Sequence, residues 1–345
     1  MGEVLIVRRG GSGSGDFKST IIVTIDAGST VEAYSDSGYT TLYKTFTEKS
    51  SGEYWLTGLA NGTYYIKATK GGDEATTSYT IAEYGVYRIS MAYRTVPEFT
   101  YTGTYELVDD NDQDISGALN TANWKIRFLT GGTLSFSNLY GAADGIDIFL
   151  VGGGGGGGTG NGGGGGGGCT ATVLNQTVST NTNYSVTIGA GGASGGQNLG
   201  GGSSAFGELG TANGGTGGAG AGSSYKGGNG GSGGGANFNK PSTSTSNGGS
   251  DGSNGYGNAS YIGTGQGTTT REFAEAGATL YAGGGAGAYG TGGDGGGADG
   301  GNGSHTSGYD AVANTGGGGG GGKDGAQFPG GAGGSGIVII RNARS

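Results

Sequence analysis

The sequence has little of what usually cross-links or organises a fold. Its 345 residues contain one cysteine, one histidine and three prolines. A single cysteine excludes an intramolecular disulfide framework, and three prolines without a sustained Gly-X-Y register exclude collagen. A zinc site needs at least three nitrogen or sulfur ligands, which this composition does not readily supply. We therefore expect a chain that folds without covalent staples, and we expect no cofactor.

Basic residues and long apolar runs are scarce as well. Lysine and arginine total 17 against 26 acidic residues, for a net charge of −9. Without a basic cluster to neutralise phosphates, we expect no nucleic-acid partner. The longest apolar runs, IIVTI and GIVIIR, are far shorter than the roughly 20 residues of a membrane-spanning helix, so we expect no membrane insertion. The start of the chain, MGEVLIVRRGG, lacks the order of a secretory signal.

Glycine is abundant, with 93 residues, and the composition changes abruptly near Val151. Two runs of seven glycines follow, from Gly152 and from Gly162, and a third begins at Gly316. Composition alone favours a disordered tether. The alternative is a folded array of glycine segments.

Residues 16–96 alternate polar and apolar positions in seven short stretches separated by turn sequences, which predicts an Ig-like β-sandwich. Ile21, Val23 and Ile25 share one face of the first stretch and belong to the expected core. The rest of that core is expected at Tyr43, Trp55, Leu59, Tyr65, Ile81, Val86 and Ile89. The stretch from Leu59 to Tyr93 resembles the carboxypeptidase-regulatory-like and Ig-like modules, which implies a scaffold and no chemistry.

Two further regions flank the sandwich. Residues 1–15 form an expected attachment segment, in which Val4, Leu5, Ile6 and Val7 add as a strand to a partner and a Gly/Ser tract is the hinge. The alternative is a frayed terminus. Residues 97–151 have strand composition in four stretches, the last of which is IDIFLV.

A continuous apolar run, Ile337–Ile340, stands just before the end of the sequence and is typical of a buried strand. A lone apolar strand is poorly stable in water, so we expect residues 336–345 to close the fold by pairing with IDIFLV. The glycine-rich region 152–335 would then leave and rejoin one small β core.

We expect residues 152–335 to form a bundle of polyglycine II helices. This helix has three residues per turn and no internal hydrogen bonds, so each peptide group points sideways to a neighbour. Only glycine lets neighbouring backbones approach on all sides. The segments between the glycine runs are rich in Ser, Thr, Asn and Tyr, and they would form loops at the ends of the bundle.

Aromatic residues in these loops are the candidate receptor-binding set. Tyrosine among Ser, Gly and Asn gives a large amphipathic contact at low entropic cost. The alternative is that each ring packs over the end of the bundle as a lid. The candidates are Tyr225, Phe238, Tyr256, Tyr261, Tyr289 and Tyr309.

Signals for other chemistry are weak. Asp110, Asp112 and Asp114 have the spacing of the first three ligands of an EF-hand loop, but Ile115 replaces the required glycine, so a solvated acidic turn is favoured over calcium. Catalysis by His305 or Cys169 lacks a supporting motif. Glu272 and Glu275 are expected to be surface residues rather than the paired carboxylates of a glycosidase. We expect no enzymatic activity.

Three stretches together resemble the glycine-rich tail adhesins of bacteriophages: IDIFLVGGGGGGG, NYSVTIGAGG and GGAGGSGIVIIRN. The resemblance implies a polyglycine II sandwich capped by variable loops that contact a bacterial surface receptor. It also implies an N-terminal region joined to a tail fibre, at the tail tip of a virion assembled in the host cytoplasm. The expected receptor is a glycan or a surface protein. The alternative is a structural or ice-binding glycine-rich surface protein.

Overall fold

The computed structural model describes residues 18–71, 73–220, 225–237, 246–303, 306–323 and 328–344. Within them the regular elements are β-strands and two short 3-10 turns, with no α-helix, which confirms the all-β prediction. None of the helical turns in this part of the chain could span a membrane. The chain divides into two compact units, Met1–Val96 with Ala118–Ala122, and Pro97–Gly117 with Asn123–Ser345.

The first unit contains two four-stranded sheets. One has the order β4-β5-β1-β8 and contains β1 (Ser19–Thr24), β4 (Thr47–Ser50), β5 (Glu53–Leu59) and β8 (Val86–Ser90). The other has the order β3-β2-β6-β7 and contains β2 (Thr30–Tyr34), β3 (Leu42–Thr45), β6 (Gly62–Lys70) and β7 (Asp73–Ile81). The stretch expected as one strand, TTLYKTFT, forms β3 and β4 in different sheets. The chain passes between them at Phe46, whose side chain is buried in the core.

The core of this unit matches the predicted set in part. The buried members of that set are Ile21, Val23, Ile25, Leu59 and Ile81. The prediction is wrong for Tyr43, which is exposed, and for the half-buried Trp55, Tyr65 and Val86. Ile89 is half-buried and packs against the core, as predicted. On β5 and β6 the inward phase is offset by one residue, so Tyr54 and Tyr64 are buried instead. Trp55 lies on the other face, where its Nε1 donates to Glu53 Oε1 at 2.6 Å.

The second unit contains two five-stranded sheets. One has the order β10-β11-β18-β13-β14 and contains β10 (Tyr105–Val108), β11 (Lys125–Phe128), β13 (Ile146–Val151), β14 (Thr170–Gln176) and β18 (Ile337–Asn342). The other has the order β17-β16-β15-β12-β9 and contains β9 (Glu98–Tyr101), β12 (Gly132–Asn138), β15 (Asn183–Thr187), β16 (Ser204–Phe206) and β17 (Gly210–Ala212). The 3-10 turns are η1 (Tyr140–Ala142) and η2 (Glu272–Ala274).

The predicted closing strand is confirmed. β18 pairs antiparallel with β13, with Val151 opposite Ile337 and Ile148 opposite Ile340. β18 also pairs with β11 on its other side. Every residue of β13 is buried, as are Ile337–Arg341 of β18, so this central pair needs apolar side chains on both faces. Both ends of the glycine-rich region therefore leave from neighbouring points of one sheet.

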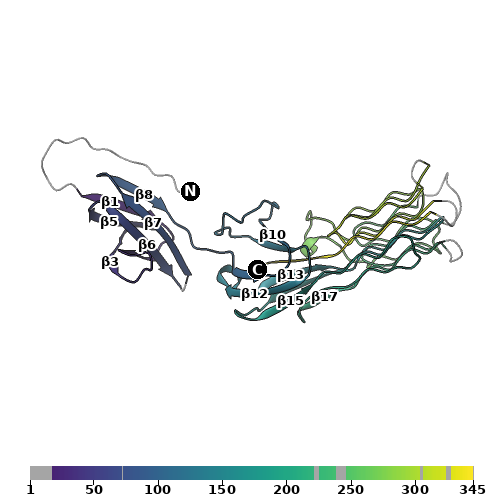
Figure 1. Ribbon diagram of the computed structural model, residues 1–345, viewed down its shortest axis with the longest axis horizontal. Coiled ribbons are helices and arrows are strands. Elements are labelled where there is room, and N and C mark those ends of the chain that lie inside the picture. The colour runs from purple at the N-terminus through teal and green to yellow at the C-terminus, as the bar shows by residue number, and fades with distance from the viewer. Residues whose placement is uncertain are drawn as a thin grey trace. The chain divides into compact units, whose positions relative to one another are not determined.

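The glycine segments between β13 and β18 lie outside strands, and we call them the glycine-rich array. Figure 1 shows them running side by side away from the sheets of the second unit. Gly152–Gly158 are all buried, although glycine has no side chain, because other backbone segments surround them. A Cβ on Gly155 would overlap the carbonyl oxygen of Thr216, and one on Gly165 would overlap that of Gly155. Close approach of backbones, rather than turn geometry, therefore requires glycine here.

Hydrogen bonds in the array are lateral and repeat every third residue. The N–H groups of Gly152–Gly158 donate at 2.8–3.0 Å to three other segments in rotation. The N–H groups of Gly152, Gly155 and Gly158 donate to residues 163–169. Those of Gly153 and Gly156 donate to residues 199–202, and those of Gly154 and Gly157 donate to residues 331–334. Carbonyl groups of the same run accept from residues 192, 215–218 and 319–322. These lateral bonds satisfy peptide groups that would be costly to bury unpaired.

Candidate functional site

The array has two ends, and the end far from the sheets is called the tip. It consists, among the described residues, of 159–161, 194–198, 225–226, 256–261, 289–291, 301–303, 306–307, 323 and 328–329. Backbone hydrogen bonds connect these turns. The N–H of Gly160 donates to Phe328 O at 3.0 Å, that of Asn161 to Lys323 O at 3.3 Å, and that of Lys323 to Thr306 O at 2.8 Å. The tip is therefore one surface made by turns that are far apart in the sequence.

Four of the predicted tyrosines lie at this tip. Asn237 connects two turns, since its N–H donates to Tyr225 O at 3.3 Å and its Nδ2 donates to Asn161 Oδ1 at 3.4 Å. Tyr261 O accepts from Gly227 N at 2.8 Å. Tyr256 is the most exposed of the candidates that the structure describes, at 56 %. The structure thus places Tyr225, Tyr256, Tyr261 and Tyr289 at one end of the array, although the first and the last of them are more than sixty positions apart in the sequence.

Tyr289 ends the outgoing segment 282–288 and lies beside another turn. Its N–H donates to Gly301 O at 2.9 Å, and Lys323 Nζ lies over its ring, 5.6 Å from the centroid. A lysine at this distance from a tyrosine face is attracted by the ring quadrupole. Ring and cation are presented together at the tip.

The other predicted contacts are placed differently. Tyr309 lies on a returning segment behind the tip, where its N–H donates to Asp299 O at 3.0 Å, and it is 41 % exposed. Phe238 lies outside the described residues. So do the attachment candidates Val4, Leu5, Ile6 and Val7, and His305. Those predictions stay predictions.

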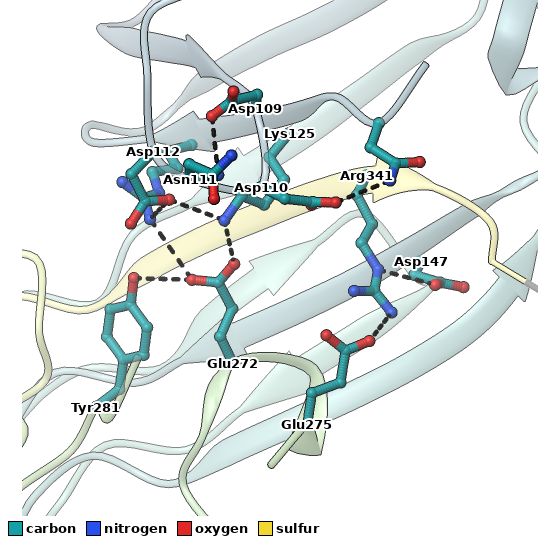
Figure 2. A network of polar contacts seen from close by, with 12 residues as sticks. Asp109, Asp110, Asn111, Asp112, Lys125, Asp147, Glu272, Glu275, Tyr281 and Arg341 are labelled. Atoms are coloured by element: carbon teal, nitrogen blue, oxygen red, sulfur yellow. Dashed lines mark hydrogen bonds and ion pairs between the residues drawn. The ribbon is translucent and has the colours of Figure 1, made fainter. Parts of the chain in front are cut away.

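A second cluster, at the sheet end of the array, was not predicted from the sequence. Figure 2 shows Glu272, from the loop before the segment 282–288, between charged residues of β11 and the β10–β11 loop. Lys125 Nζ lies 2.9 Å from Glu272 Oε1 and 2.8 Å from Asp112 Oδ1. Arg127 joins both carboxylates, at 2.5 Å from Asp112 and 3.6 Å from Glu272. We call these four residues the ionic cluster.

Ion pairs extend from this cluster along β18. Arg341 Nε lies 3.1 Å from Asp147 Oδ2, and Arg341 Nη2 lies 2.7 Å from Glu275 Oε1, as Figure 2 also shows. Arg344 pairs with Asp110 at 2.6 Å. A cavity of about 340 Å³ lies among these groups, lined by Asp110, Asp112, Lys125, Glu272, Glu275, Ala276, Gly277, Ala278, Thr279, Arg341 and Arg344. Four carboxylates and three cations line it together, so its charges largely offset one another.

The electrostatics of the ionic cluster favour fixed charges over proton transfer. Burial acts to raise the pKa of Asp112, but hydrogen bonds and charges from Lys125 and Arg127 outweigh it and lower that pKa below the ordinary value. Burial and the charge of Glu272 raise the pKa of Tyr281, whose hydroxyl donates to Glu272 Oε2 at 3.3 Å. A carboxylate held by two cations is a poor general acid. The cluster is suited to joining the loop at 267–281 to the sheet.

Two predictions from the sequence concern residues of this region. The expectation that Glu272 and Glu275 are surface residues is wrong for Glu272, whose side chain is 5 % exposed, whereas that of Glu275 is 51 % exposed. The three spaced aspartates each have a partner of their own: Asp110 has Arg344, Asp112 has Lys125, and Asp114 Oδ1 accepts from the N–H of Ser116 at 2.8 Å. Within the described residues no group of three potential metal ligands is found.

Comparisons with known proteins agree with the composition of this unit. Residues 130–343 match the family model of the glycine-rich domain, and the chain belongs to that family. No curated protein matches the sequence. Among solved structures, the chain is similar to BcpA, the major pilin subunit of Bacillus cereus, at 12 % identity and a TM-score of 0.20. The match covers 39 % of this chain and 42 % of the pilin. Its TM-score is too low to carry a structural argument.

Proposed function

We propose that this protein is a phage or prophage tail adhesin that binds a glycan or protein receptor on a bacterial surface through the turns at the tip. The observation that supports it is the gathering of Tyr225, Tyr256, Tyr261 and Tyr289 on one end of an array whose other end is anchored in two sheets. Tyrosines among Ser, Asn and Gly supply adaptable contacts. Under this proposal the chain is a binding protein and not an enzyme.

The proposal includes a polyglycine II bundle as the platform. In that helix, successive peptide groups point about 120° apart because there are three residues per turn. The rotation of hydrogen-bond partners along Gly152–Gly158, with every third residue returning to the same neighbour, supports this assignment. A platform held by lateral bonds on all sides keeps its turns in fixed positions, which lowers the entropic cost of binding.

Backbone conformation at the tip also supports a binding role. Tyr225 has φ 53° and Tyr289 has φ 67°, in the left-handed region that bulky residues rarely adopt. Such strain persists only where the surroundings hold it, and it is commonest at functional sites. The two tyrosines thus occupy turn positions whose backbone conformation glycine would adopt more easily.

We assign the remaining parts of the chain to attachment and spacing. The β-sandwich of the first unit would act as a spacer, and Val4–Val7 would add as a strand to a tail or fibre protein. The proposed location is therefore a virion tail tip, where the protein would act outside the cell after assembly in the host cytoplasm.

Whole-cell labelling tests the proposal. The full chain carrying a fluorophore is applied to a panel of bacteria, beside a Tyr256→Ser, Tyr261→Ser double variant. Tyr84→Ser is the matched control, because Tyr84 is 51 % exposed and lies in the first unit. We expect the wild type and the control to label one group of strains, and the tip variant to label it at least about tenfold more weakly, as for loss of a binding hot spot.

Two results would count against the proposal. Equal labelling by all three proteins would remove the tip as the contact surface. Labelling of no strain by the wild type, together with growth arrest of ice crystals, would favour the structural or ice-binding alternative.

A further inference from the structure

Charge is distributed unevenly along the second unit. The described residues of the tip contain two charged side chains, Lys226 and Lys323, and no carboxylate. By sequence alone, the joining segments outside the described residues also contain Lys240 and Asp324. The chain as a whole has a net charge of −9. The described part of the tip therefore carries positive charge only, on a chain whose net charge is negative.

Three carboxylates of the array that lie away from the tip are hydrogen-bonded. Asp299 Oδ1 accepts from Gly292 N at 2.7 Å, and Asp310 Oδ1 accepts from Ala332 N at 2.6 Å, both on the segments behind the tip. Asp251 accepts from Thr269 at 2.5 Å at the sheet end. Their acceptor oxygens thus serve the fold and do not face the two lysines as ion-pair partners.

We infer that the tip recognises an anionic glycan, with carboxylate or phosphate groups bound at Lys226 and Lys323 and sugar rings placed against the tyrosines. Lys226 is exposed, and Lys323 is held over the ring of Tyr289. This pairing offers a cation and an aromatic face to one ligand, as a charged sugar requires. The inference rests on the proposed adhesin function and specifies its receptor class.

The net negative charge of the chain supports the same inference. A polyanionic surface repels a chain of net charge −9 at every face except a cationic one, so approach is steered toward the tip. Two lysines are too few for the phosphate contacts of a nucleic acid. Steering of this kind weakens with salt, because the screening length falls from about 30 Å at 0.01 M to about 8 Å at 0.15 M.

Binding to defined polymers tests the inference. The full chain is titrated against a polyuronate, a phosphorylated dextran and unmodified dextran. The variant is Lys226→Gln with Lys323→Gln, and the matched control is Lys44→Gln with Lys49→Gln, which removes two exposed lysines of the first unit. We expect binding to one or both anionic polymers, weakened about tenfold in the tip variant at low salt, and unchanged in the control. The two anionic arms distinguish carboxylate from phosphate recognition.

Equal binding to unmodified dextran, or an unchanged affinity in the tip variant, would overturn the inference. Labelling of bacteria is measured with the same proteins so that the two proposals are separated. Full labelling by the tip variant would retain the adhesin and overturn the anionic receptor. Polymer binding without labelling of any strain would retain the charge preference and overturn the adhesin. Amide exchange of residues 152–168 checks that the tip variant is folded, and exchange of β1 and β6 checks the control variant.

Discussion

The β-sandwich of the first unit and the glycine-rich array of the second pair their buried peptide groups and fill their interiors in opposite ways. In the sandwich, strands pair their peptide groups within two sheets, and side chains such as Leu56 and Ile66 fill the space between them. In the array, peptide groups pair with neighbours on several sides, and almost no side chain lies between them. Packed side chains stabilise the first unit, whereas in the second unit the absence of side chains lets backbone segments lie close enough to pair.

This difference predicts where each unit tolerates change. A sandwich core loses stability when a side chain is shortened, because a cavity remains. The array should lose stability when a side chain is lengthened by a single methyl group, because the adjacent atom is a backbone carbonyl that cannot rotate away. The same substitution to alanine is thus a truncation in one unit and an insertion in the other.

The largest effect is expected for Gly155→Ala. The new Cβ would overlap the carbonyl oxygen of Thr216, so two segments must separate and lose lateral hydrogen bonds. We expect a loss of about 4 kcal/mol or more in the free energy of unfolding of the array, measured by chemical denaturation. Gly303→Ala is the control, because a Cβ there meets nothing within 4 Å. A similar loss in both variants would contradict the close-packing account.

Leu56→Ala should have the next largest effect. Leu56 is 1 % exposed in the core of the sandwich, and such truncations cost about 3 kcal/mol. Calorimetry should show an earlier transition for the first unit, with amide protection in the array unchanged. Leu42→Ala, at a site that is 51 % exposed, should be nearly neutral. Loss of protection in both units from Leu56→Ala would show that they unfold together.

Glu272→Gln tests the ionic cluster. The substitution keeps the shape but removes the negative charge beside Lys125, which is 8 % exposed. We expect a loss of about 2 kcal/mol, below the cost of a fully unpaired buried charge because Asp112 remains. Faster amide exchange should be confined to residues 267–281. Glu275→Gln, whose side chain is 51 % exposed, should change little; an equal effect would refute the role of burial.

The smallest effect is expected from pH. The pKa of Asp112 is lowered in the folded protein, so its ionised form contributes stability above the ordinary aspartate value of 3.8. That contribution is lost as pH falls from this value through the lower folded pKa. Because the side chain is 40 % exposed, solvent screening limits the effect to less than about 1 kcal/mol. Asp112→Asn should flatten the acid limb of stability, and an unchanged limb would contradict the assignment.

Some of the fold could be predicted from the sequence for a physical reason. Ile337–Ile340 is too apolar to stay in water, and the strand IDIFLV needed a neighbour on each side, so their pairing was predictable despite the distance between them. The phase of β5 and β6 was not, because both alternating faces carry aromatic residues. Period alone could not decide whether Tyr54 or Trp55 faces the core.

The candidate site could be predicted less well. Tyrosine enrichment supplied the candidates, and the turns at the tip gather four of them, whereas their role in binding stays a prediction. The ionic cluster gave no sequence signal, since Lys125 and Glu272 are 147 residues apart and stand in unrelated stretches. Local acidic spacing at Asp110–Asp114 instead predicted a solvated acidic turn, with calcium only as a weak alternative. Arg341 and Arg344, beside an apolar run near the end of the sequence, were the available hint of buried partners.

The most direct test of the account is amide hydrogen exchange on the full chain, resolved over the two runs 152–158 and 162–168. Lateral bonding predicts strong protection of these glycines, comparable to β13 and β18, and its joint loss in Gly155→Ala. Exchange of both runs at the rate of an unstructured glycine peptide, while β13 and β18 stay protected, would contradict the account.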